Sequence, residues 1–171
     1  MVYGIEPNKY FLKLSKENPR LDSVVIKNSS IYHLPFRNKF DICIANRVVD
    51  HIKDIDTAFK EINKALKHRG VFVFVIAHPL KALSKGYRQK IDGYLSEKKD
   101  FFSPSSMGVK IPFYYRSISR YAEVASRAGF VIEEIAEPRP VKKAKKLFPK
   151  KYDLFSRNPE VLAMRLRKDT R

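Results

Sequence analysis

The sequence lacks several features that mark whole classes of protein. It has a single cysteine, Cys43, which excludes an internal disulfide and a cysteine-rich metal cluster. No apolar run approaches the ~20 residues that a membrane-spanning helix needs. The amino terminus also lacks the charged, apolar and small-residue regions of a secretory signal. We therefore expect a cytoplasmic protein with no membrane span.

Glycine is scarce and scattered. The glycines are Gly4, Gly70, Gly86, Gly93, Gly108 and Gly129, and no two of them fall within one short loop. A loop that brings backbone amides close to a nucleotide uses several glycines a few residues apart. The sequence given contains no such loop.

Acidic residues are outnumbered almost two to one. Thirty-five Lys and Arg residues against eighteen Asp and Glu residues give a formal net charge of +17. A field of this sign attracts nucleic acid, anionic lipid or acidic substrates. Most basic residues are dispersed, and the one dense cluster is KKAKKLFPKK at 142–151. This cluster is either a solvated connection or a phosphate-binding stripe, and the charge makes nucleic acid a partner to consider.

Strand and helix patterns alternate along the chain. Apolar runs predict strands at 2–6, 23–27, 40–45, 71–77, 130–135 and 160–167, and amphipathic patterns predict helices at 8–18, 56–68 and 118–128. Strand 71–77 is apolar on both faces, as in the centre of a parallel sheet. Asp56 and Gly70 are the expected N-cap and C-cap of helix 56–68. With 171 residues and 44% hydrophobic content, we expect one α/β domain over 1–171.

A series of short motifs follows the same order. They are Leu34-Pro35-Phe36, Phe40-Asp41 entering a strand, VVDHI at 48–52, Gly70 before an apolar strand, Tyr114-Tyr115-Arg116, Ala128-Gly129-Phe130 and EPRP at 137–140. In order and spacing these motifs resemble the class I S-adenosylmethionine-dependent methyltransferases, most closely the small-molecule enzymes called methyltransferase type 11. The resemblance covers nearly the whole chain. It implies a Rossmann-like, mostly parallel sheet with helices on both faces, S-adenosylmethionine as cofactor and methyl transfer to a small organic acceptor.

The resemblance also identifies a missing element. Family members begin with a strand ending in a Gly-x-Gly-x-Gly loop, and that strand lies between the strands that end here at Glu6 and Ala45. Without it, two ladders of buried backbone groups would lack partners, each group costing roughly 1–3 kcal/mol. Three explanations follow: the chain is a fragment of a longer protein, the two flanking strands pair directly, or another chain supplies the strand. We prefer the first, and the second would make the protein a degenerate binding module.

Candidate cofactor residues follow the predicted strands, because ligands of open α/β sheets bind outside the carboxyl ends of strands. Glu6 ends the first strand, where a carboxylate can accept hydrogen bonds from ribose hydroxyls; the alternative is a carboxylate that simply meets water there. By resemblance, Ser30 stands where the family usually has an aspartate that binds the adenine amino group. Ile31 would lie against the adenine, and Asn46 would reach the methionine end.

Candidate catalytic residues are histidines that follow strands. Methyl transfer from a sulfonium mainly requires the acceptor to be positioned, and a hydroxyl or protonated nitrogen acceptor also needs a base. His51 and His78 are the candidates for that base. Alternatively, His51 belongs to a structural motif and His78 caps a strand end. Asp50, Tyr114 and Tyr115 could equally shape the acceptor pocket.

The segment 80–115 is expected to form a lid and acceptor-binding insertion, with a helix near 85–98. Connections mounted on a rigid scaffold commonly hold specificity, and the aromatic residues of this segment suit an apolar or planar acceptor. Two alternatives to a small-molecule methyltransferase stay open. One is an RNA-directed methyltransferase, motivated by the charge of +17, and the other is a non-catalytic methyltransferase-like binding protein, motivated by the missing loop.

Overall fold

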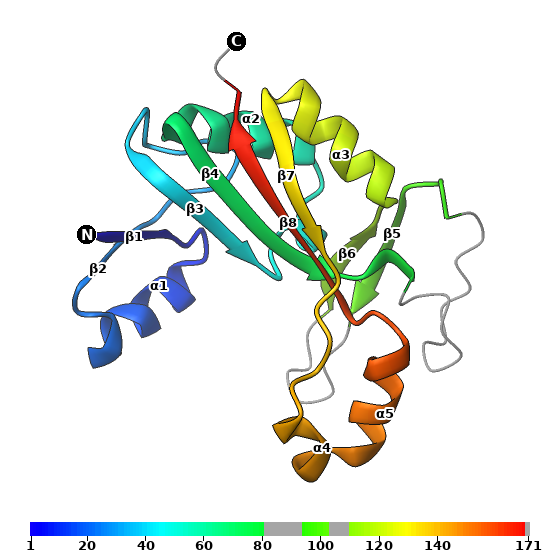
Figure 1. Cartoon of the computed structure of the whole chain (residues 1–171). Helices are drawn as coiled ribbons and strands as arrows, with labels where there is room; N and C mark the ends of the chain where they lie inside the picture. The colour runs from blue at the N-terminus through cyan, green and yellow to red at the C-terminus, as the bar shows by residue number, and fades with distance from the viewer. Residues whose placement is uncertain (81–93, 103–109, 170–171) are drawn as a thin grey trace.

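The computed structural model describes residues 1–80, 94–102 and 110–169. Its largest sheet has the order β3-β4-β8-β7, formed by Phe40–Asn46, Leu66–Ala77, Val161–Lys168 and Phe130–Ala136. Strand β3 is parallel to β4, and β8 runs antiparallel to both β4 and β7. All strands of this sheet except β8 therefore point the same way (Figure 1). The predicted Rossmann-like α/β class with a mostly parallel sheet is confirmed.

The core lies between this sheet and the helices α2 (Ile55–Ala65) and α3 (Ile118–Arg127). The ring of Phe59 from α2 makes edge contacts with Phe72 and Phe74 of β4, at centroid distances of 5.3 and 5.5 Å. Alternate residues of β4 and β8 are buried beside them: Phe72, Phe74, Ile76, Leu162, Met164 and Leu166. Residues with the opposite orientation are more exposed, because side chains alternate between the two faces of a sheet.

Helix α2 differs at both ends from the prediction. Its N-cap is Asp54, whose Oδ1 accepts a hydrogen bond from the Thr57 amide at 3.0 Å, and not Asp56. The helix ends at Ala65, so the expected C-cap Gly70 was also wrong: Gly70 lies inside β4. A Cβ at Gly70 would come within 3.0 Å of the Lys67 carbonyl oxygen and a methyl carbon of Leu66. Glycine therefore fits this closely packed position in a strand without displacing its neighbours.

A separate pair of parallel strands precedes this sheet. Strands β1 (Val2–Ile5) and β2 (Val24–Lys27) are joined through α1 (Lys9–Lys16) and the short 3-10 helix η1 (Pro19–Leu21). In the described part of the chain β1 pairs only with β2, and β3 pairs only with β4. The explanation that the flanking strands pair directly is therefore wrong. The second edge of β3, which we call the free edge, has no partner strand among these residues.

Aromatic side chains, and not a backbone ladder, attach the β1–β2 pair to the rest of the molecule. The Tyr3 ring of β1 lies 5.6 Å from the Phe36 ring and 5.5 Å from the Phe40 ring. The ammonium of Lys39 sits 3.9 Å from the centre of the Tyr3 ring, within range of a cation–π interaction. Side-chain packing thus replaces the hydrogen bonds of a continuous sheet.

Two further units lie near the carboxyl ends of β4 and β7 (Figure 1). Strands β5 (Lys98–Phe102) and β6 (Ile111–Tyr115) form an antiparallel pair, and helices α4 (Lys143–Leu147) and α5 (Pro149–Arg157) lie between β7 and β8. The expected helix at 85–98 falls mostly outside the described residues, and its last part is wrong because 94–97 form turns before β5. Among the described helices, none is both long enough and apolar enough to cross a membrane.

Candidate functional site

The ends of β1 and β2 place two of the predicted cofactor segments side by side. The amide of Glu6 donates to the Lys27 carbonyl at 3.0 Å, and the Asn28 side-chain amide donates back to the Glu6 carbonyl at 2.8 Å. Glu6 and the turn at 28–31 therefore form one corner of the molecule. Asn46 lies at the carboxyl end of β3, in the other sheet.

The Glu6 carboxylate makes one local hydrogen bond and can accept others. Its Oε1 accepts a hydrogen bond at 2.8 Å from the amide of Asn8, the N-cap residue of α1. Among the described residues, nothing donates to the second carboxylate oxygen. A carboxylate can accept several hydrogen bonds, so Glu6 can hold the helix start and still accept from a ligand hydroxyl.

The turn after β2 makes hydrogen bonds within itself that the predicted cofactor role of Ser30 does not need. The Ser30 hydroxyl accepts a hydrogen bond from the Tyr32 amide at 3.3 Å, and the Ser30 carbonyl accepts from the His33 amide at 3.0 Å. Ile31 is half-buried and packs against the core. Asn46, by contrast, is exposed, and its side chain makes no hydrogen bond with the described residues. The roles of Ser30, Ile31 and Asn46 as adenine and methionine contacts stay predictions.

His51 lies on the 3-10 helix η2 (Val49–His51), directly after β3. Its Nδ1 lies 2.8 Å from the Pro112 carbonyl oxygen, which can only accept, so Nδ1 carries the proton of the neutral ring. Nε2 is then unprotonated and lies 3.7 Å from Oδ1 of Asp50. The ring also contacts Phe113 edge-on and is partly exposed. This geometry leaves one nitrogen able to take up a proton.

His78, immediately after β4, is held on both sides of its ring. The Leu80 amide donates to Nδ1 at 3.1 Å, so Nε2 carries the proton and donates to Oε1 of Glu137 at 2.8 Å. The ring is fully buried. Because both nitrogens are occupied, the contacts favour a role in positioning the chain after β4, and the catalytic role of His78 stays a prediction.

A small cavity lies between the end of β4, η2 and β6. It is lined by Asp50, Ala77, His78, Pro79, Phe113, Tyr114, Tyr115, Arg116 and Tyr121. The structure thus brings together Asp50, Tyr114 and Tyr115, the residues considered for the acceptor pocket. Burial raises the pKa of Tyr121 to about 12, so its hydroxyl stays protonated and can donate at neutral pH.

Two buried polar atoms face this region without a hydrogen-bond partner in the described part of the chain. They are Oδ1 of Asp50 and Nη1 of Arg116. The other oxygen of Asp50 accepts from the Ala77 amide at 3.0 Å and pairs with Arg47 at 3.2 Å. Unpaired buried polar atoms are uncommon and costly, so a water or a polar ligand group is expected to satisfy them. Arg116 was not singled out as a site residue from the sequence.

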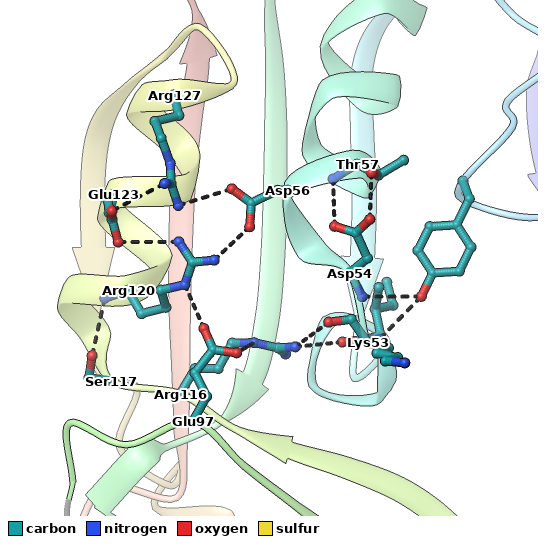
Figure 2. A network of polar contacts seen from close by, with 12 residues as sticks. Lys53, Asp54, Asp56, Thr57, Glu97, Arg116, Ser117, Arg120, Glu123 and Arg127 are labelled. Atoms are coloured by element: carbon teal, nitrogen blue, oxygen red, sulfur yellow. Dashed lines mark hydrogen bonds and ion pairs between the residues drawn. The ribbon is translucent and has the colours of Figure 1, made fainter.

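Arg116 also fixes the β5–β6 pair to the helices (Figure 2). Its Nη2 donates to the carbonyls of Ile52 and Lys53 at 2.9 and 2.8 Å, and its Nε pairs with Glu97 at 3.3 Å. Glu97 in turn accepts from Arg120 of α3 at 2.5 Å. The network continues through Asp56, Glu123 and Arg127. It ties Glu97, the residue before β5, to Arg116 after β6 and to Arg120 of α3.

Comparison with known proteins relates this arrangement to methyltransferases. Residues 1–74 match the family model of a methyltransferase domain. A stretch of 84 residues is 31% identical to the ubiquinone biosynthesis O-methyltransferase of Pelagibacter ubique, covering 47% of this chain and 35% of that enzyme. The aligned part thus spans about a third of its relative.

Solved structures match over almost the entire chain. An S-adenosylmethionine-dependent methyltransferase from Mesorhizobium loti superposes with a TM-score of 0.79 at 20% identity, over 98% of this chain and 80% of that one. A protein from Listeria monocytogenes described in the same terms gives 0.79 at 19% identity, over 99% and 80%. The chain has the class I methyltransferase fold. Glu6, the 28–31 turn, Asn46 and the cavity beside β4 lie at the carboxyl ends of their strands, where ligands of open α/β sheets bind.

Proposed function

We propose that this methyltransferase-like domain binds S-adenosylmethionine at the ends of β1, β2 and β3 and transfers its methyl group to a small acceptor beside His51, directly after β3. The observation that supports this most is the position of Glu6, the 28–31 turn and Asn46 at the carboxyl ends of their strands. The described residues fit the cofactor in part. Glu6 and Asn46 have free hydrogen-bonding capacity, but the chain offers no glycine-rich turn.

The acceptor we propose carries a hydroxyl group. S-adenosylmethionine supplies an already activated methyl group, so the protein has to position the acceptor and remove its proton. Nε2 of His51 is placed to take that proton, with the Asp50 carboxylate 3.7 Å away to pair with the charged ring. The 31%-identical relative is named an O-methyltransferase, which agrees with an oxygen acceptor.

Calorimetric titration with S-adenosylhomocysteine, the demethylated product, tests the cofactor site. We expect micromolar binding by the chain, weakened at least several-fold by Glu6→Ala, because a carboxylate bond to a ribose hydroxyl contributes about 1.5–3 kcal/mol. Glu17→Ala, at the C-cap of α1, is the matched control and should bind as the parent does. Equal binding by Glu6→Ala would remove Glu6 from the site.

To test His51 as the general base, an acceptor substrate must first be found by screening. His51→Gln should lower kcat about 100-fold or more, as loss of a general base does, while leaving affinity for S-adenosylhomocysteine unchanged. His33→Gln, an exposed histidine after β2, is the control. Unchanged kcat in His51→Gln would assign the proton transfer to another group or to water.

A second candidate function is a non-catalytic binding module. It is favoured by the free edge of β3 together with the absence of a glycine-rich loop. A folded, monodisperse chain that binds no S-adenosylhomocysteine would support this candidate. An RNA-directed methyltransferase, the other alternative raised by the net charge of +17, predicts RNA binding that weakens steeply with salt.

A further inference from the structure

A pair of short helices projects from the sheet between β7 and β8. Helices α4 and α5, with the flanking residues 141–142, form what we call the basic hairpin, residues 141–157. They contact chiefly each other, and Figure 1 shows them beyond the carboxyl end of β7, away from α2 and α3. Packing against the core therefore does not explain their side chains.

The basic hairpin carries much of the excess charge. Seven basic residues and one acidic residue occur in it: Lys142, Lys143, Lys145, Lys146, Lys150, Lys151, Arg157 and Asp153. All six lysines are exposed. None of these lysines forms an ion pair with a carboxylate of the described residues, although ten other Lys and Arg side chains in the same described part of the chain do. These lysines thus form a concentrated positive surface that the carboxylates of the described residues do not neutralise by ion pairs.

Large apolar side chains are exposed among these lysines. Their exposed fractions are 71% for Val141, 62% for Leu147, 58% for Phe148 and 47% for Leu154. Leu154 follows Lys150 and Lys151 by four and three residues in α5, so the three share one helix face. Contacts to phosphates use only the lysines and leave the exposed aliphatic side chains Val141, Leu147 and Leu154 without a role. A lipid surface binds both the lysines and the apolar residues.

We propose that the basic hairpin docks the protein on an anionic bilayer surface. Lysines would pair with lipid headgroups, while Leu147, Phe148 and Leu154 enter the boundary between headgroups and acyl chains. Because the hairpin lies near the carboxyl end of β7, docking would bring that edge of the sheet close to the membrane. The inference does not depend on catalysis and holds whether or not the domain transfers methyl groups.

Flotation of the full chain with lipid vesicles at physiological salt tests the proposal. We expect at least about tenfold more binding to vesicles containing about one third phosphatidylserine than to pure phosphatidylcholine vesicles. Lys145→Glu/Lys146→Glu should lose most of this binding. Leu147→Ser/Phe148→Ser, which keeps every charge, should lose about fivefold or more. Circular dichroism establishes that each variant is folded.

The matched control is Lys9→Glu/Lys16→Glu on α1, which changes the net charge equally at another exposed helix. It should bind vesicles as the parent does, and an equal loss would mean that only total charge matters. Equal binding to neutral and anionic vesicles would overturn the proposal. So would normal vesicle binding by Leu147→Ser/Phe148→Ser. In that case, tight binding of a single-stranded RNA oligonucleotide that is lost in Lys145→Glu/Lys146→Glu would assign the hairpin to nucleic acid.

Discussion

The four-stranded sheet and the β1–β2 pair both contain parallel neighbouring strands, but they are stabilised differently. Strands β4 and β8 bury alternate side chains against α2 and α3. Strands β1 and β2 and helix α1 contain no buried residue, and three side chains of α1, Tyr10, Phe11 and Leu14, are exposed apolar groups. The comparison teaches that burial against helices stabilises the four-stranded sheet, whereas the β1–β2 pair depends on a few contacts of partly buried side chains such as Tyr3 and Ile5.

Strand β3 shows this contrast within a single strand. Ala45 is buried towards the helices, whereas its neighbours on the opposite face, Ile42 and Ile44, are 60% and 74% exposed. β-branched side chains on a strand are ordinarily covered. Both the free edge of β3 and the exposed face with Ile42 and Ile44 therefore lie beside the position where the resemblance places the glycine-loop strand.

The largest expected effect is a difference in the free energy of unfolding between a variant in the core of the four-stranded sheet and a variant in α1. Phe59→Ala should lower the free energy of unfolding by about 3–5 kcal/mol, because it removes a fully buried ring from the core between α2 and β4. Phe11→Ala on α1, half of whose side chain is exposed, should change it by less than about 0.5 kcal/mol. Urea denaturation followed by circular dichroism measures both. Similar losses would show that α1 packs as tightly as α2.

A second pair of variants tests the two faces of β3. Ala45→Asp should destabilise by about 3 kcal/mol or more, since it buries an unpaired charge. Ile44→Asp should cost about 0.5 kcal/mol or less, because the side chain is already in solvent. Thermal melts of both proteins give the comparison. A large loss in Ile44→Asp would mean that a part of the protein covers this face.

Arg116 tests how the β5–β6 pair is attached, in contrast to the aromatic attachment of β1. Arg116→Ala should cost about 1.5–3 kcal/mol, the usual effect of losing charged hydrogen bonds. Arg116→Lys should rescue little, because an ammonium cannot reproduce the planar fork that reaches Ile52, Lys53 and Glu97 together. Limited proteolysis at β5 should accelerate in both variants. The exposed Arg20→Ala is the control, and full rescue by lysine would contradict the account.

The smallest expected effect concerns Glu61 of α2. It binds Leu34 and Arg37, which lie in the sequence between the β1–β2 pair and the four-stranded sheet. Its carboxylate accepts from the Leu34 amide and from Arg37, both at 3.2 Å, and the hydrogen bond from Lys64 lowers the pKa of Glu61. The folded protein therefore binds this proton less readily than the unfolded chain. The stabilisation that ionised Glu61 gives the folded protein is complete above the ordinary glutamate pKa of about 4.3. It is lost as the pH falls through the lowered pKa of the folded state.

Glu61→Gln should accordingly be about 1 kcal/mol less stable at pH 7 and lose less stability on acidification than the parent. Urea denaturation at pH 7 and pH 4 measures this difference. Glu17→Gln, which removes an exposed ion pair between Lys13 of α1 and its C-cap residue, should follow the parent at both pH values. Parallel pH profiles for Glu61→Gln and the parent would contradict the proposed link.

The fold could be predicted from the sequence because alternating apolar strands and amphipathic helices are local signals. The break between β1 and β3 could also be anticipated, since it follows from a missing motif. Helices α4 and α5 were not predicted, because lysine-rich stretches lack the apolar periodicity of a packed helix. Strand β5 was missed for a similar reason, since KKDFF at 98–102 reads equally well as a helix end.

The candidate site was harder to predict than the fold. The strand-end rule predicted that Glu6, Asn46 and His51 lie at or just after strand ends, and the structure has them there, but their roles in a site stay predictions. It could not distinguish His51 from His78. The two rings differ in their partners, Pro112 and Glu137, which lie 61 and 59 residues further along the chain. Arg116 escaped notice because two of its partners are the backbone carbonyls of Ile52 and Lys53, which lie more than 60 residues away and leave no trace in sequence. Contacts of this kind require the three-dimensional structure.

The central claim is that β3 has a free edge, and amide hydrogen exchange followed by NMR tests it most directly. The Arg47 amide donates to Val75 of β4 at 2.8 Å, so by the two-residue period of a strand the Ala45 amide faces β4 and the Ile44 and Asn46 amides face the free edge. The account predicts rapid exchange at Ile44 and Asn46 with strong protection at Ala45 and Phe74. Strong protection at Ile44 would contradict it, because a strand would then have to occupy the free edge.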